Sequence, residues 1–248
     1  MKGFTCCRIL WIRVAILLLN SLRARADSAS SAFGFLGNGF VILASDTAFR
    51  RGSQVISRDI NQVTVLGPRL LLATVGDVST GDQFAEFLAR NFALTSVVHG
   101  RPVSTRSAAH FARREMSRLL RRGPVQADLL VAGVDGPFHS DLSTQLAKGV
   151  VDESARSVTP QLHSPQLQPQ LHWIDRAGGA CEVQYGAHGG SAAMVLAVLD
   201  EGWRPGMSEG EALVLARECV HVLGGRYAAS PQGWRFHVVD GAGARLAG

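Results

Sequence analysis

Residues 70–77 read LLLATVGD, an apolar run that stops at a glycine and an aspartate. Two helical patterns follow it, at residues 80–94 and 104–124, before the next apolar run begins at residues 129–134. Short β-rich runs bounded by Gly, Pro or Asp predict strands. The sequence here therefore predicts a strand, then two consecutive helices, then another strand.

The same order recurs along the rest of the chain. Two further helical patterns lie at residues 191–199 and 208–223, and the second opens with the capping box Ser-Glu-Gly-Glu. Paired helices argue against a doubly wound βαβ chain. We predict an α+β fold, a four-layer αββα sandwich in which helix pairs cover two stacked antiparallel sheets. The other predicted strands are residues 40–44, 63–66, 171–174, 181–185 and 236–239.

The chain is predicted to hold one domain, residues 30–248, behind an N-terminal extension of residues 1–29. The extension has a basic start, an apolar stretch and a small-residue site at residues 24–26, which resemble a secretory signal. A propeptide or a wrongly assigned start is the alternative, because no N-x-[ST] acceptor or disulfide spacing follows. A polar stretch at about residues 137–170 predicts a surface loop insertion.

Composition and motif spacing argue against a disordered chain, a metal site and a phosphate-binding loop. The chain is 46% hydrophobic and 18% charged, which is typical of a globular domain. The histidines have neither HxxxH nor HExxH spacing, and the glycine-rich turns match no phosphate loop, so we predict neither a metal nor a cofactor.

Almost all of the basic charge is arginine, since the only lysines are Lys2 and Lys148. A helical segment carries several of these arginines at amphipathic spacing. Such a segment forms either a solvated helix face or a rim that docks on a partner. We favour either interpretation over nucleic-acid binding. Its arginines are Arg113, Arg114, Arg118, Arg121 and Arg122.

Several segments, taken together and in order, resemble β-type subunits of the 20S proteasome, and among these the non-catalytic β4 (beta type-2) members. The resemblance implies the N-terminal nucleophile hydrolase fold and a stacked-ring hetero-oligomer with other β-type and α-type subunits. It also implies a location in cytoplasm and nucleus, which conflicts with the signal-like extension. It implies no nucleic-acid partner and no membrane partner. The segments are VILASDT (41–47), LLLATVGD (70–77), QFAEF (83–87), LLVAGVD (129–135), AHGG (187–190) and VLD (198–200) followed by Arg204-Pro205.

Catalytic members of this family expose an N-terminal Thr, which a Lys, an Asp, a Ser and an Asp-x-x-Ser group assist. The resemblance places the nucleophile at Ser30, the first Asp at Asp46 and the Lys at Gln62. A neutral amide cannot supply the positive charge that lowers the proton affinity of the nucleophile. The site is therefore predicted to be vestigial, with Asp46 as a structural acid. The remaining vestigial positions are Ser191, Tyr227 where the second Asp would stand, and Ser230.

Two functions follow. The first is a non-catalytic structural β-type subunit, needed for β-ring assembly in ubiquitin- and ATP-dependent protein degradation. The alternative is an active N-terminal nucleophile hydrolase that uses Ser30 after residues 1–29 are removed. Ala29 stands where the family cleaves after Gly, and Gln62 stands where it has Lys. We therefore favour the structural subunit.

Overall fold

The computed structural model describes residues 30–51, 54–123, 125–136, 167–226 and 233–247. Within them, strands form two five-stranded sheets and a short hairpin of β3 (Phe49–Arg51) with β4 (Gln54–Ser57), and every pairing is antiparallel. The first sheet has the order β10-β1-β2-β11-β12, with bounds Tyr185–Gly189, Ser31–Leu36, Val41–Asp46, Trp234–Val239 and Ala244–Ala247. The second has the order β5-β6-β7-β8-β9, with bounds Val63–Gly67, Leu70–Gly76, Ala127–Asp135, Gln168–Ile174 and Ala180–Glu182.

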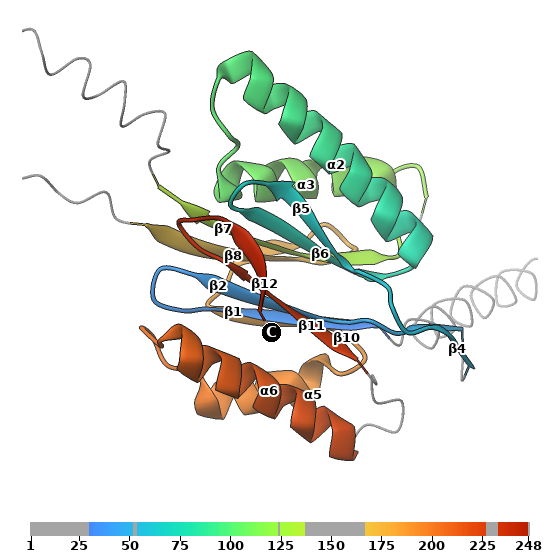
Figure 1. Cartoon of the computed structure of the whole chain (residues 1–248). Coiled ribbons are helices and arrows are strands. Elements are labelled where there is room, and N and C mark those ends of the chain that lie inside the picture. Colours follow the sequence, from blue (N-terminus) through green and yellow to red (C-terminus); the bar gives the residue numbers. More distant parts are fainter. Residues whose placement is uncertain (1–29, 52–53, 124, 137–166, 227–232, 248) are drawn as a thin grey trace, which may run out of the picture.

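Two pairs of helices enclose the stacked sheets (Figure 1). Helices α2 (Val78–His99) and α3 (Thr105–Leu120) cover the second sheet, and α5 (Ala192–Gly202) and α6 (Glu209–Arg226) cover the first. The layers thus follow the order helices, sheet, sheet, helices, which confirms the predicted αββα sandwich.

The LLLATV run is apolar on both faces because its strand, β6, is covered on both sides. Leu72 packs with the α2–α3 helices, whereas Leu71 and Ala73 pack with Leu43 of the first sheet. A strand buried on both faces needs a continuous apolar run rather than alternation. The neighbouring β7 shows the same pattern, with all but its last residue buried.

The structure differs from the predicted elements at several places. The strand predicted at residues 181–185 is divided between β9 and β10, which belong to different sheets. The chain crosses between the sheets here, since the Val183 N–H donates to Leu171 O and the Leu36 N–H donates to Gln184 O, each at 2.9 Å. The prediction also missed β1, whose sequence SAFGFL is interrupted by glycine, as well as β3, β4 and β12.

The predicted insertion at about residues 137–170 extends too far at its C-terminal end. Residues 168–170 belong to β8, where Gln168 pairs with Asp135 and Gln170 with Gly133. The polar side chains there are compatible with a strand because the start of β8 is more exposed than its centre. Residues 137–166 lie outside the described part of the chain.

Replacing residues 137–166 with an Asn-Gly dipeptide is expected to leave the melting temperature of the chain within about 4 °C of wild type. The ends already meet, because a β-carbon placed on Gly136 would lie 3.7 Å from the Cα of Leu167. The β7–β8 register is also set by seven residue pairs outside the replaced segment, and Asn-Gly favours a tight hairpin. Thermal melting checks this, with a Gly/Ser segment of the natural length as control. Loss of a cooperative transition in the Asn-Gly variant alone would contradict it.

Candidate functional site

Four of the predicted vestigial positions lie at one end of the sandwich. Ser30 precedes β1, Asp46 ends β2, Gln62 precedes β5 and Ser191 follows β10. Antiparallel pairing brings Ser30, Asp46 and Ser191 together, since β1 pairs with both β2 and β10. Gln62 joins them from the second sheet through β6, which is hydrogen-bonded to Gln62 at Thr74 and to Ser30 at Gly76. All four side chains are buried. Tyr227 and Ser230, the other two positions, lie outside the described residues.

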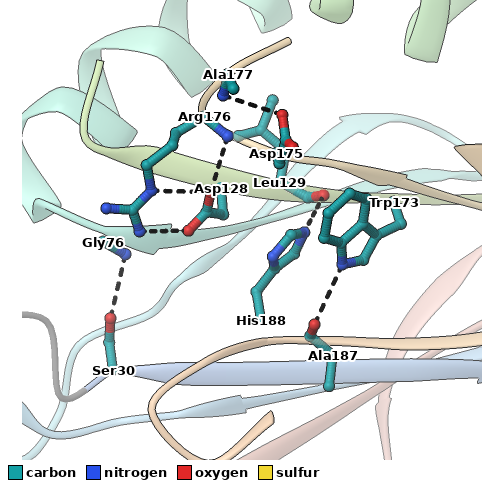
Figure 2. A network of polar contacts seen from close by, with 10 residues as sticks. All are labelled: Ser30, Gly76, Asp128, Leu129, Trp173, Asp175, Arg176, Ala177, Ala187 and His188. Carbon is teal, nitrogen blue, oxygen red and sulfur yellow. Dashed lines mark hydrogen bonds and ion pairs between the residues drawn. The ribbon is translucent and has the colours of Figure 1, made fainter. Parts of the chain in front are cut away.

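The Ser30 hydroxyl is already engaged with the backbone. Its oxygen accepts a hydrogen bond from the Gly76 N–H at 3.2 Å (Figure 2). A serine nucleophile needs a base that takes its proton, and a separate N–H that stabilises the developing oxyanion. Among the described residues no side-chain base is hydrogen-bonded to Ser30. The neighbouring Gly76 N–H donates to the hydroxyl oxygen itself, so it is not a separate donor for an oxyanion.

Gln62 contributes no charge to this region. Its backbone carbonyl accepts from the Thr74 N–H at 3.0 Å, which joins the start of β5 to β6. Its side-chain oxygen is buried and forms no hydrogen bond within the described part of the chain. A neutral side-chain amide cannot promote ionisation of a nearby hydroxyl.

Asp46 and Ser191 hold local backbone. The Asp46 carboxylate accepts from the Ala48 N–H at 2.8 Å, a bond that closes the turn after β2. The Ser191 N–H donates to the Ser31 hydroxyl at 3.3 Å, which joins the start of α5 to β1. The Ser191 hydroxyl is buried but has no hydrogen-bond partner among the described residues, so only the backbone of Ser191 makes this link.

A buried aromatic contact between His188 and Trp173 lies beside this region. The His188 ring stacks on Trp173 with centroids 4.6 Å apart. Its Nε2 lies 3.2 Å from Leu129 O, and because a carbonyl only accepts, Nε2 carries the proton (Figure 2). Burial lowers the pKa of His188 below its ordinary value. His188 is thus a neutral residue that ties β10 to β7.

An ion pair clamps the turn between β8 and β9 to the start of β7. Asp128 accepts from the backbone N–H of Arg176 at 2.8 Å and from its guanidinium at 3.2 and 2.5 Å (Figure 2). The hydrogen bond to Asp128 raises the pKa of Arg176. Sequence reasoning missed this pair, because nothing in the pattern links residues 48 positions apart.

The described residues show neither a metal cluster nor a membrane helix. No group of three or more His, Cys, Asp or Glu side chains that could hold a metal ion occurs among them. None of the helices in the ranges given above is both long enough and apolar enough to cross a bilayer.

Comparison with known proteins gives one family and several relatives. The family model described as proteasome subunit matches residues 26–148 and 164–239. Proteasome subunit beta type-2-A of Arabidopsis thaliana is 29% identical over 213 residues, which cover 86% of this chain and 90% of the relative. Proteasome subunit beta type-4 of Saccharomyces cerevisiae is 29% identical over 206 residues, which cover 83% and 90%. Proteasome subunit beta type-2 of Oryza sativa is 28% identical over 212 residues, which cover 86% of each.

Proposed function

The chain belongs to the proteasome subunit family, in the class of its β type-2 and type-4 members, and we propose that it serves as a non-catalytic structural subunit of the 20S core. In this role it takes its place in the β ring and contributes contacts rather than peptide-bond hydrolysis. The ring then acts in ubiquitin- and ATP-dependent protein degradation.

The observation that carries this proposal is the state of Ser30 and Gln62. The buried Ser30 hydroxyl accepts from Gly76 and has no base bonded to it among the described residues. The position expected for the activating lysine is the neutral Gln62. In a processed hydrolase the freed amine of Ser30 would itself take the proton, but the neutral Gln62 would supply no positive charge to lower the proton affinity of the hydroxyl. The Gly76 N–H also donates to the hydroxyl oxygen rather than being free for an oxyanion. These two features favour the structural role.

The proposed partners are other β-type and α-type proteasome subunits in a stacked-ring assembly, and the proposed location is cytoplasm and nucleus. Support for the partners comes from the family match over most of the domain and from relatives that are named as proteasome subunits. Intact mass and N-terminal sequence of the chain, purified through a tagged α-type subunit, test both the assembly and the fate of residues 1–29. Absence of the chain from purified particles would contradict the proposal.

Ser30→Ala is expected to leave every peptidase activity of the assembled particle unchanged, because the Ser30 hydroxyl has no role in bond cleavage. Purified particles are assayed with fluorogenic peptides of each specificity class. Ser31→Ala is the matched control, since it removes the neighbouring hydroxyl that accepts from Ser191. Loss of one activity class in Ser30→Ala particles of normal subunit composition, with Ser31→Ala unaffected, would favour the hydrolase instead.

A further inference from the structure

The outer face of α3 carries a dense arginine cluster. One hollow of about 330 Å³ lies among its long side chains and contains no acidic residue in its lining. The only acid on α3 is Glu115, which is buried and already contacts Arg114 and Arg118. One carboxylate therefore serves several arginines, and the face keeps an excess of positive charge within the helix. The residues that line the hollow are His110, Arg113, Arg114, Ser117, Arg118 and Arg121.

Contacts within the chain hold three of these guanidinium groups in place. Arg113 Nε donates to Gly178 O at 3.1 Å, and Arg118 donates to Glu115 at 3.0 Å. The Arg114 guanidinium lies 5.1 Å from the centre of the Phe111 ring. Side chains that are already ordered lose less conformational entropy when a ligand binds. A planar guanidinium also matches a carboxylate through two parallel hydrogen bonds.

The arginine face continues into an exposed apolar stripe on α2. Phe111, beneath Arg114, stacks on Phe87 with centroids 6.3 Å apart. Phe87 is 42% exposed, and Leu94 and Val98, seven and eleven residues further along α2, are 64% and 67% exposed. Residues at this spacing lie on one side of a helix. An exposed apolar stripe beside a cationic rim is a pattern of protein interfaces.

We propose that the arginine face of α3 and the apolar stripe of α2 form one docking surface for an acidic segment of a neighbouring subunit. Aspartate or glutamate side chains of that segment enter the hollow, and its apolar side chains cover Phe87, Leu94 and Val98. The proposal rests on the assembly role given above and adds the chemistry of the partner. A protein segment fits better than a nucleic acid, because a phosphate backbone would leave the apolar stripe exposed to water.

The variant Ser117→Glu tests the charge of the hollow. Its carboxylate would stand four residues from both Arg113 and Arg121, the spacing at which helical ion pairs are favourable. The helix is therefore expected to keep its stability, while the hollow loses its attraction for a partner's acid. Reversing Arg114 or Arg118 is less suitable, because it would remove one of the two partners of the buried Glu115 and place a second carboxylate beside it.

We expect Ser117→Glu to enter particles about tenfold less than wild type, and Ser117→Gln, of the same size without charge, to enter normally. Native gels measure incorporation, and thermal melting of the full-length chain shows that both variants fold. Equal incorporation of Glu and Gln variants, or an equal loss in both, overturns the proposal. Failure of the wild-type chain itself to enter particles would instead overturn the proposed function.

The identity of the occupant is tested by a photoreactive amino acid introduced at position 110, on the edge of the hollow. In purified particles it is expected to crosslink to a peptide of another proteasome subunit that contains Asp or Glu. A crosslink to nucleic acid, to residues 137–166 of the same chain, or to no other chain overturns the proposal.

Discussion

Gly189→Ala is expected to cost about 4 kcal/mol or more in free energy of unfolding. Gly189 has φ +98, a left-handed conformation that L residues rarely adopt. A β-carbon there would lie 2.1 Å from Ser30 O and 2.9 Å from the Cα of Ser31. Both neighbours are backbone atoms, so relief requires β1 to move away from β10, with which Ser31 and Gly189 pair.

Denaturant unfolding of the full-length chain measures this cost, and Gly39→Ala is the matched control. Gly39 also has a positive φ, +80, but a β-carbon there meets no atom within 4 Å. Its substitution should therefore cost only the free energy of holding an alanine in the left-handed conformation, about 1–2 kcal/mol. If the two variants lose the same stability, the close approach of Ser30 to Gly189 is not what requires glycine.

Arg176→Ala is expected to lower the free energy of unfolding by about 2–3 kcal/mol, which is less than the loss expected on breaking a fully buried ion pair. The expected loss is smaller because water screens this pair in part: the Asp128 side chain is 10% exposed and the Arg176 side chain 37%. Removing the guanidinium leaves a buried carboxylate that, among the described residues, keeps only the hydrogen bond from the backbone N–H of residue 176. The turn it held also packs against α3 through Gly178.

The control for this prediction is Arg90→Ala, which breaks an ion pair with Glu86 whose side chains are 76% and 61% exposed. An exposed helical pair contributes about 0.5 kcal/mol or less. Joint replacement of Asp128 and Arg176 with Leu should recover part of the loss, since no unpaired charge then remains. Equal effects of Arg90→Ala and Arg176→Ala would show that the clamp contributes no more than a surface pair.

The layer order of this fold could be predicted from the sequence because it rests on local patterns. Continuous apolar runs such as residues 70–75 identify strands buried on both faces, and helical periodicity identifies the paired helices. The chain crossing at residues 183–184 could not be predicted this way. Both flanking strands are short, and the switch between sheets depends on hydrogen bonds to Leu171 and Leu36, which are remote in sequence.

For the candidate site, the sequence by itself determined which chemical groups are present. No lysine occurs between Lys2 and Lys148, and Gln62 stands where the catalytic members of the family have their lysine. Residues 3–147 therefore contain no activating lysine, whatever their arrangement in space. That conclusion needs only residue identity, because an amide is neutral wherever it lies.

Only the tertiary structure decided how those groups are used. It joins Ser30 to Gly76, clamps Arg176 on Asp128, and places Phe87 of α2 against Phe111 of α3 so that the apolar stripe meets the arginine face. Each contact depends on strand register or helix packing. Hydrophobic periodicity specifies which side of an element is buried, but not which distant residue it faces, because that choice is made by the packing of the whole domain.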